Sequence, residues 1–526
     1  MTAVLAQAQP LQAPSIHYLA ISPMLVVFGA AIVGVLVEAF VPQRSRRVAG
    51  LAVALGGVLA ALGLVVFLAQ DLNSATDPML GLVARDAIAV DGPALFLQAA
   101  ILALAATSLL LLAERAPADR VPAAVDGDVA ATSARGLASL RALPPEHTEI
   151  FPLTLFAVGG MLLFVSAHNL IVMFVALEIL SLPLYLLSGL ARRRRLLSQE
   201  AAVKYFLLGA FSSAFFLYGV ALLYGFAGSV SLTAIRDAAG QPSGDDPLLY
   251  AGLALLGVGL LFKVGAVPFH SWTPDVYQGA PTPVTAFMAA CTKVAAFGAL
   301  LRVLLVTFYN LRGDWRPAIG AVAVLTMVVG AVIAVTQTDV KRMLAYSSIA
   351  HAGFILTGVA ASSRRGLSSS MFYLLAYGFI VIGAFGVVTL VRDADGEATH
   401  LSKWQGLGRR SPAVAGLFAF FLFALAGIPF TSGFFGKFAV WGAAVDGGVT
   451  YLVIVGVVTS AVAAFFYARV VVMMFFQEPA ADGPEVARLR PLTSAALGVC
   501  LAATIVLGVV PELVVDIAGR SELFVR

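Results

Sequence analysis

Long apolar runs separated by short polar stretches dominate this chain. A helix needs about 20 apolar residues to cross the hydrocarbon core of a membrane, and about fourteen runs approach that length. The spanning backbone must satisfy its own hydrogen bonds, and the ten-residue alternation of a β-barrel does not occur. The pattern therefore predicts an all-α polytopic membrane protein with about 14 transmembrane helices. The predicted ranges are 18–41, 47–70, 93–114, 149–166, 168–190, 199–226, 249–270, 281–308, 317–337, 340–361, 368–391, 411–433, 450–477 and 491–515.

The composition supports a membrane protein. Sixty per cent of the 526 residues are apolar and only 12% are charged, whereas a soluble domain carries about 25% charged residues. A chain of this kind has too little polar surface to stay in water. No Lys or Arg precedes Arg44, so the positively charged start of a cleavable signal peptide is missing. We expect the first apolar run to be retained as a membrane helix.

Cysteine usage and net charge argue against several kinds of site. The two cysteines, Cys291 and Cys500, each stand alone in an apolar stretch. Without a CxxC pair, neither an iron–sulfur cluster nor a cysteine-based zinc site is expected. The net charge of +4 comes from basic residues in short loops and not from a basic face with interleaved aromatic residues. Nucleic acid is therefore not an expected partner, whereas the lipid bilayer is.

Basic residues are distributed unevenly between the two sides of the predicted bundle. If the N-terminus lies outside, 19 Lys and Arg residues fall in inner loops and eight fall in outer loops. Because cytoplasmic loops carry the excess of Lys and Arg, both termini are expected on the outer side of a bacterial inner membrane. Arg364 and Arg365 fit this orientation poorly. The connection 116–148 then becomes a cytoplasmic loop that follows a three-helix membrane segment at 1–115.

Two similar segments place Pro-Phe inside an apolar run. They are GAVPFHSW (265–272) and AGIPFTSG (426–433). Proline removes a backbone hydrogen bond and breaks a helix, so breaks are expected at Pro268 and Pro429, and also at Pro183 within LEILSLPLY. In transporters, paired broken helices in corresponding positions of two halves point to the ion path. The two segments therefore suggest an ion path built from two related halves.

Five charged side chains stand out within the predicted spans, where a charge costs about 2.5–3.5 kcal/mol on insertion scales. They are Glu178, Lys204, Lys263, Lys293 and Lys437. Lys204 stands near a helix start, so its stem can also extend the ammonium group to the membrane interface. For the other four, the structural alternative is a buried ion pair that holds helices together.

The functional interpretation of these charges is a proton path. Removal from water disfavours the charged ammonium, so a buried lysine can accept and release a proton near neutral pH, and a nearby carboxylate favours the charged form again. Movement of Glu178 toward or away from Lys204 would then switch whether Lys263 holds its proton. The membrane potential contributes about 2.3 kcal/mol per charge per 100 mV. This energy is similar in size to the free energy of such a shift in the pKa of a buried lysine.

Two histidines can extend such a path. His270 follows the expected break at Pro268, and His351 lies in the segment DVKRMLAYSSIAHAGF. An unperturbed histidine titrates at about pH 6.5, so either side chain can relay protons. A hydrogen-bonded role in helix packing is the alternative for both residues.

Several segments between about 150 and 440 resemble a known family. They are FVSAHNLIVMFVALEILSLPLY, AAVKYFLLGAFSSAFFLYGVALLYG, FKVGAVPFHSWTPDVYQGAPTPVTAF, DVKRMLAYSSIAHAGF and GIPFTSGFFGKF. In these segments the chain resembles the antiporter-like subunits of proton-pumping NADH–quinone oxidoreductase, respiratory complex I. LEILSLPLY and Lys437 point to the subunit N type. The resemblance implies two inverted five-helix repeats, helices 4–8 (149–308) and 9–13 (309–477), with helices 7 and 12 broken. Helix 14 and a tail (478–526) follow.

The resemblance also implies roles for matching residues. Glu178 would be the gating carboxylate of helix 5, and Lys204 its partner on helix 6. The remaining members of the path would be the central carrier Lys263, the relay Lys293, the exit group Lys437 and, also at a family position, His351. Together these residues would carry protons from the cytoplasm to the outer side.

By the same resemblance, the chain would be a non-redox subunit of an H⁺-translocating NADH:quinone oxidoreductase. Its partners would be the neighbouring antiporter-like and small membrane subunits of complex I. No cofactor is expected in this chain, because NADH, FMN, iron–sulfur clusters and quinone would bind to partner subunits. The energy for proton movement would come from quinone reduction there.

Three other functions stay open on the sequence. A multisubunit Na⁺/H⁺ antiporter shares the fold and motifs, although no second intramembrane carboxylate stands out as a cation ligand. A subunit of a membrane-bound hydrogenase would differ only in its partners. A passive membrane anchor for a peripheral enzyme gains nothing from intramembrane charges that are costly to insert, so the charges argue against that class.

Overall fold

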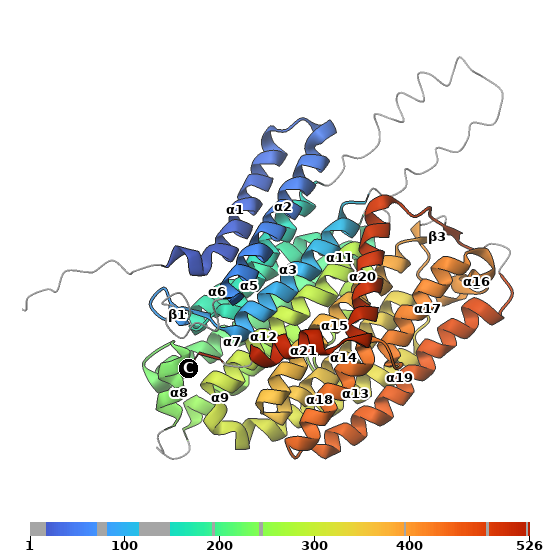
Figure 1. Ribbon diagram of the computed structural model, residues 1–526. Coiled ribbons are helices and arrows are strands. Elements are labelled where there is room, and N and C mark those ends of the chain that lie inside the picture. The colour runs from blue at the N-terminus through green and yellow to red at the C-terminus, as the bar shows by residue number, and fades with distance from the viewer. Residues whose placement is uncertain are drawn as a thin grey trace, which may run out of the picture.

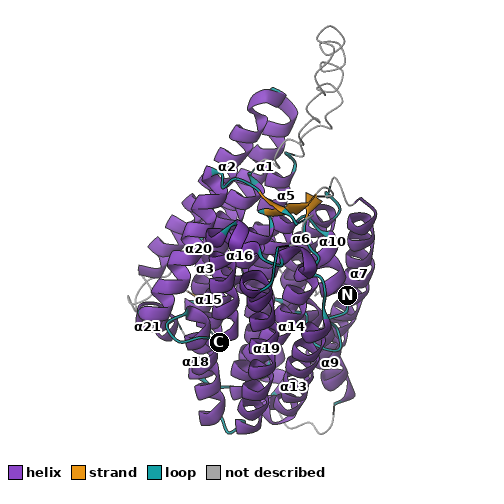
Figure 2. Cartoon of the chain, turned by 90° about the vertical axis from the view of Figure 1, so that its right-hand side faces the viewer, coloured by secondary structure: helices purple, strands orange, loops and turns teal. Residues whose placement is uncertain are grey.

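Helices make up nearly all of the described structure, and most of them run side by side in one bundle (Figure 1 and Figure 2). In the described part of the chain, twelve helices are long and apolar enough to cross a membrane. The predicted class, an all-α polytopic membrane protein, is thus confirmed. The computed structural model describes residues 17–70, 81–114, 148–191, 195–240, 246–393, 396–479, 483–521 and 524–525.

The N-terminal segment begins with two helices that form a hairpin, part of which projects beyond the rest of the bundle (Figure 1). A short antiparallel strand pair then leads to a helix packed inside the bundle. The predicted cytoplasmic loop 116–148 lies, apart from Thr148, outside the described residues. The elements are α1 (Tyr18–Phe40), α2 (Gln43–Gln70), β1 (Gly81–Val83), β2 (Ile88–Val90) and α3 (Gly92–Leu112).

The range predicted as the first repeat folds into long helices with one break and several helical turns. Two of the turns, η2 and η3, are π-helical, and η4 is a 3₁₀ turn. The elements are α5 (Ile150–Ser166), α6 (Leu170–Ser188), α7 (Arg195–Ala227), α8 (Leu232–Ala239), α9 (Pro247–Val264), α10 (Trp272–Gly279), α11 (Thr282–Phe287), η2 (Met288–Thr292), α12 (Lys293–Arg302), η3 (Val303–Thr307) and η4 (Tyr309–Leu311).

The rest of the chain adds a second group of long helices, again with one break, and two C-terminal helices. A small three-stranded sheet of order β4-β3-β5 lies at one end of this part. The elements are α13 (Arg312–Thr336), α14 (Val340–Ala361), α15 (Arg364–Val388), β3 (Val391–Asp393), β4 (Gly396–Glu397), η5 (Leu401–Trp404), α16 (Leu407–Arg410), α17 (Pro412–Ala426), α18 (Ser432–Asp446), α19 (Thr450–Phe476), β5 (Glu485–Val486), α20 (Pro491–Val509) and α21 (Glu512–Arg520).

The predicted number of fourteen spans stays a prediction. Each predicted range contains a helix, but α5 and α17 have only 17 and 15 residues. Both are shorter than the roughly 20 residues that a straight span requires. The inverted relation between the two groups of helices likewise stays a prediction.

Three helical segments form the centre of the bundle. All of the most apolar window of 282–307 is buried, and the corresponding share is 94% for both α14 and α15. In contrast, only 33% of the most apolar window is buried in each of the helices α1, α2 and α19. A helix that is apolar on every side belongs either in a core or in lipid, and here the tertiary structure separates the two cases. Lys293 and His351 belong to the central segments.

The breaks expected at two Pro-Phe segments are confirmed. Helix α9 ends at Gly265 and α17 ends at Gly427, with φ angles of +77° and +87°. Glycine adopts this left-handed conformation without a Cβ clash and commonly ends helices in this way. The chain then passes Pro268 or Pro429 before the next helix, α10 or α18, begins. Each break leaves backbone carbonyl groups without intrahelical partners inside the bundle.

The break expected at Pro183 is wrong. Helix α6 runs continuously across this residue from Leu170 to Ser188. A single proline removes only one backbone hydrogen bond, and a membrane helix tolerates this where neighbouring groups compensate. Neither of the glycines that end α9 and α17 has a counterpart next to Pro183.

A buried ion pair joins the start of α3 to the end of α12. The Nη1 and Nη2 atoms of Arg302 donate to the two carboxylate oxygens of Asp91 at 2.9 and 2.7 Å, and Nε donates to the Val165 carbonyl at 3.0 Å. Asp91 also accepts from the backbone of Ala94 and so caps α3. Both side chains are almost completely buried. Such a pair is costly to break because the remaining charge stays buried without its partner.

We therefore expect Arg302→Met to destabilise the protein by about 3–5 kcal/mol, because Asp91 is left as an unpaired buried charge. The measurement is the unfolding temperature of the purified complex in detergent. Asp446→Asn is the matched control, since it removes one partner of the exposed Arg365–Asp446 pair and should cost below about 1 kcal/mol. Equal unfolding temperatures for the two variants would contradict a stabilising role for the buried pair.

Candidate functional site

Lys263 lies in the last turn of α9, directly before the break. Its side chain is 4% exposed, and its Nζ lies 5.2 and 5.5 Å from the ring centroids of Tyr205 and Tyr185. Among the described residues, Nζ has no hydrogen-bond partner. The ring faces and the negative end of the helix dipole both favour the ammonium form. The group is therefore held by weak attractions and not by a direct salt bridge.

Glu178 is the carboxylate next to Lys263. It belongs to α6 and interacts electrostatically with both Lys263 and Tyr185. One of its carboxylate oxygens is buried without a hydrogen-bond partner among the described residues. The two predicted path members Glu178 and Lys263 are thus brought together.

The expected pair between Glu178 and Lys204 is not formed. Instead, Nζ of Lys204 lies 2.7 Å from Asp275 Oδ2 and 2.7 Å from Glu200 Oε1. Glu200 precedes Lys204 by one helical turn, where side chains meet on the same face. The side chain of Lys204 is 41% exposed, so its ammonium group extends toward the surface and not toward Glu178.

Three aromatic rings lie between α6, α7 and α10 beside Lys263. Tyr185 and Tyr205 meet edge to face with centroids 4.7 Å apart, and Tyr205 stacks on Trp272 at 4.7 Å. The indole Nε1 of Trp272 donates to the Phe262 carbonyl at 2.9 Å. The same carbonyl also accepts from the backbone N–H of Gly265 at 3.0 Å, so the indole bond holds α10 against the end of α9.

Lys293 is the first residue of α12 and follows the π-helical turn η2. Its Nζ donates to the Ser348 carbonyl at 2.7 Å and lies 5.6 Å from the ring centroid of Tyr377. π-Helical turns inside helices often occur at functional sites. The hydroxyls of Tyr277 and Tyr377 lie near Ser348. The residue whose carbonyl accepts from Lys293 thus lies close to two tyrosines.

His351 lies on α14 between two of the lysines. It interacts electrostatically with both Lys293 and Lys437. Its Nδ1 lies 2.8 Å from the Tyr373 hydroxyl, and its Nε2 lies 3.4 Å from the Tyr467 hydroxyl. Both ring nitrogens thus face hydroxyl groups, which can donate or accept.

Lys437 lies on α18, just after the second break. Its Nζ donates to the carbonyls of Leu425 and Ala426 at 3.0 and 2.8 Å and to Ser460 Oγ at 2.9 Å. The two carbonyls are at the C-terminus of α17, which carries partial negative charge. The break thus supplies the acceptors for a buried ammonium group.

The structure divides the predicted site residues into two groups. Glu178 and Lys263 interact near the first break, and His351 interacts with both Lys293 and Lys437, the latter next to the second break. Lys204 and His270 belong to neither group. His270 lies half-buried in the connection between α9 and α10, and no direct contact in the described part of the chain joins it to the other six.

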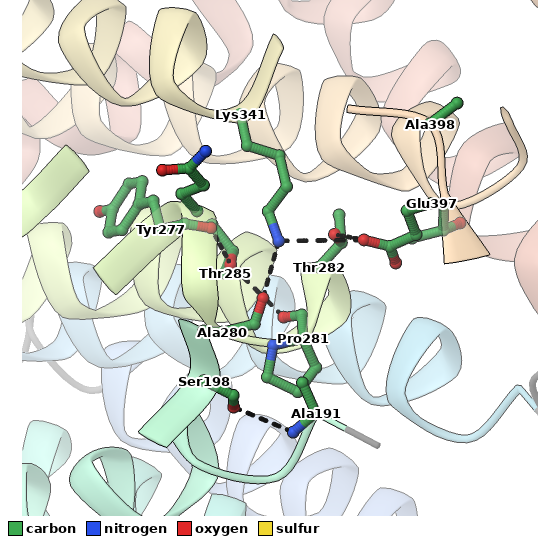
Figure 3. Close-up of polar contacts among 12 residues, drawn as sticks. Ala191, Ser198, Tyr277, Ala280, Pro281, Thr282, Thr285, Lys341, Glu397 and Ala398 are labelled. Carbon is green, nitrogen blue, oxygen red and sulfur yellow. Dashed lines mark hydrogen bonds and ion pairs between the residues drawn. The ribbon is translucent and has the colours of Figure 1, made fainter. Parts of the chain in front are cut away.

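Sequence reasoning missed a polar cluster at one end of the bundle. The Nζ of Lys341 donates to the Ala280 carbonyl at 2.7 Å and lies 3.9 Å from Glu397, which also accepts from the Thr282 hydroxyl (Figure 3). Lys341 lies at the very start of the predicted span 340–361, yet its side chain is only 2% exposed. The cluster joins the start of α14 to the junction of α10 and α11.

Two further charges were also missed, although both lie in apolar runs. They are Arg302, described above, and Arg469. The guanidinium group of Arg469 donates to the carbonyls of Val335 and Gln337 at 2.7 and 2.8 Å. These acceptors are at the C-terminus of α13, so Arg469 caps that helix. A simple count of charged residues within each predicted span would have found both arginines.

Comparisons with known proteins agree with the fold. Residues 167–463 match the family described as NADH:quinone oxidoreductase/Mrp antiporter, TM. The chain is 59% identical to NADH-quinone oxidoreductase subunit N of Rhodococcus opacus, and the match covers 99% of each chain. The identity to subunit N of Mycobacterium tuberculosis is 54%, with 98% of this chain and 100% of that protein covered.

Solved structures give the same result. A chain of respiratory complex I from Thermus thermophilus with bound aureothin is 32% identical, with a TM-score of 0.74 and 94% of this chain and 99% of that chain covered. A chain of the Mrp complex from Dietzia is 22% identical, with a TM-score of 0.79 over 96% and 97% of the two chains. That second likeness concerns the fold alone. Full-length identity of this size shows that the chain belongs to the NADH-quinone oxidoreductase subunit N family, a group of antiporter-like membrane subunits of respiratory complex I.

Proposed function

We propose that this chain translocates protons as a membrane-arm subunit of NADH-quinone oxidoreductase. The observation that carries the proposal is the state of three buried lysines, Lys263, Lys293 and Lys437. Each is at most 4% exposed, and among the described residues none forms an ion pair. Carbonyl groups and aromatic rings surround them instead. A permanent buried ion pair would hold each lysine in the charged form, whereas these surroundings allow the proton to leave.

The proposed path begins at the first break and ends at the second. Lys263 takes up the proton. The negative charge of Glu178 beside it favours the charged form of Lys263, and neutralisation of Glu178 disfavours that form. Lys293 receives the proton next, His351 relays it, and Lys437 releases it. The electrostatic contact of His351 with both Lys293 and Lys437 supports this order. The same observations argue against the alternative that the lysines are buried pairs that only hold helices together.

The step from Lys263 to Lys293 requires intermediate groups. No hydrogen bond joins the two lysines among the described residues. Tyr277, Tyr377 and Ser348 lie beside Lys293 and carry hydroxyl groups that can pass a proton together with water. Buried water of this kind is a regular part of polar protein interiors.

The redox chemistry would take place elsewhere in the assembly. We propose that this chain is a non-redox subunit, with NADH, FMN, iron–sulfur clusters and quinone bound by partner subunits. Quinone reduction there would supply the energy. The neighbouring antiporter-like and small membrane subunits of complex I would be its direct partners in a bacterial inner membrane, with both termini on the outer side.

A second candidate function is sodium/proton exchange. The fold likeness to a chain of the Mrp complex from Dietzia favours this alternative. Na⁺ is bound by oxygen ligands, and Glu178 is the one carboxylate in the described part of the proposed path. His270 has no assigned step in either function.

Lys263→Ala should abolish proton translocation, because no other described ammonium group lies at the first break. In inverted membrane vesicles, we expect NADH-driven proton uptake to fall to about a hundredth of wild type or lower, the minimum loss expected for a positioned proton-transfer group. NADH oxidation is followed in the same vesicles. Lys403→Ala, outside the path, serves as control. Wild-type uptake in an assembled Lys263→Ala complex would overturn the role of this residue.

Sodium dependence distinguishes the two candidate functions. In vesicles prepared without Na⁺, with choline as the replacement cation, we expect NADH-driven proton uptake to keep its full rate. The reason is that the groups that carry the proton in the proposed path are ammonium and imidazole groups, and the single carboxylate of Glu178 offers few oxygen ligands for Na⁺. Loss of uptake that returns on addition of Na⁺ would favour sodium/proton exchange.

The orientation has a direct test of its own. A protease-cleavable tag placed after Arg526 should be cut in spheroplasts and protected in inverted vesicles, because the excess of Lys and Arg lies on the opposite side. The reverse pattern of cleavage would show that the predicted orientation is wrong.

A further inference from the structure

A chain of four charges lies at the end of the bundle where α7, α10 and α14 meet. The ammonium group of Lys204 is shared by Glu200 and Asp275, each at 2.7 Å. The other oxygen of Asp275 accepts from Arg342 Nη1 at 2.7 Å. Glu200 and Lys204 belong to α7, Asp275 to α10 and Arg342 to α14. Charges therefore alternate across three helices.

The charge chain lines an open hollow of about 100 Å³. Glu200, Asp275 and Arg342 all contribute to its wall. Their side chains are 54%, 31% and 28% exposed. Small water-soluble molecules can therefore reach this cluster, unlike the buried residues near the breaks.

Glu178 is a carboxylate inside the bundle, with one oxygen buried and without a hydrogen-bond partner among the described residues. It lies seven residues before Tyr185 on α6, which corresponds to about 10 Å along the helix axis. Tyr185 in turn packs against Tyr205, the residue after Lys204. The carboxylate of Glu178 is thus deeper than the carboxylates of Asp275 and Glu200. In the structure it interacts electrostatically with Lys263, whereas Lys204 binds Asp275 and Glu200.

We propose that Asp275 is a positioning residue that holds Lys204 at the surface and thereby leaves Glu178 to act on Lys263. The inference rests on the proton path proposed above. One ammonium group cannot bind the surface carboxylates and the buried carboxylate at once. When Lys204 is held by Asp275, Glu178 keeps its full negative charge for Lys263. When Lys204 moves to Glu178, that charge is neutralised.

Arg342 connects the exchange of partners at Lys204 to the other half of the path. Its guanidinium group neutralises part of the Asp275 charge and so weakens the hold of Asp275 on Lys204. Arg342 belongs to α14, the same helix that carries His351 and the Ser348 carbonyl bound by Lys293. A shift of α14 therefore changes the partners of Lys204 and Lys293 together. This arrangement links proton uptake at the first break to release toward the second.

The test measures where the Lys204 amine lies in the purified, intact complex. A small water-soluble acetylating reagent modifies exposed lysines, and mass spectrometry gives the acetylated fraction of Lys204. In Asp275→Asn, we expect the rate of acetylation to fall by about tenfold, the factor for loss of one charge-assisted hydrogen bond. Asp275→Glu should keep the wild-type rate because it keeps the charge.

Two further variants separate this effect from general damage. In Asp275→Asn/Glu178→Gln, the acetylation rate should return to the wild-type range, since the buried carboxylate no longer attracts Lys204. Asp237→Asn, which changes the exposed Arg236–Asp237 pair far along the chain, should leave the rate unchanged. Faster or unchanged acetylation in Asp275→Asn would overturn the inference, because a merely structural role for Asp275 predicts a looser and more exposed lysine.

Proton uptake is the second measurement. Asp275→Asn should lower NADH-driven proton uptake, whereas Asp275→Glu should restore it. Acetylation does not depend on pumping, so the two proposals can fail separately. Normal uptake in Lys263→Ala together with the expected acetylation pattern would overturn the proton path and keep the positioning role. Loss of uptake in Lys263→Ala with unchanged acetylation in Asp275→Asn would support the proton path and overturn the positioning role of Asp275.

Discussion

A buried ammonium group needs oxygen atoms or ring faces around it, and this requirement explains the two breaks in the helical bundle. An unbroken helix keeps its carbonyl groups within its own hydrogen-bond ladder. At Gly265 and Gly427 the ladder ends inside the protein. Lys263 then occupies the negative end of α9, and Lys437 binds the last carbonyls of α17 directly. The breaks thus provide sites where a lysine can be buried without a permanent counter-charge.

The surroundings of the charges divide the interior into structural and functional parts. Arg302 and Asp91 form a bidentate ion pair, and Arg469 caps α13 through two carbonyl groups. Arginine stays charged, so these contacts are suited to holding helices together. The buried lysines have weaker surroundings and a side chain that can lose its proton. The difference in chemistry, and not burial alone, separates the two sets.

Helix α14 has a central place in this arrangement. It carries Arg342 near its start and His351 nine residues later, about 14 Å along the axis. Lys341, directly before Arg342, binds the junction of α10 and α11, and the carbonyl of Ser348, between Arg342 and His351, accepts from Lys293. One almost completely buried helix therefore contacts the surface charges, the middle of the proposed path and the residues that lead to Lys437.

The sequence by itself determined the membrane class, the approximate helix ranges, the two breaks and the burial of Lys263, Lys293 and Lys437. These features follow from local composition, because a span or a glycine-proline break is decided by neighbouring residues. Only the tertiary structure decided the partners: Asp275 and not Glu178 for Lys204, and Asp91 for Arg302, 211 residues away. It also decided that α6 continues through Pro183. Contacts of this kind depend on how helices pack against one another, and the apolar pattern along a single helix carries little information about that packing.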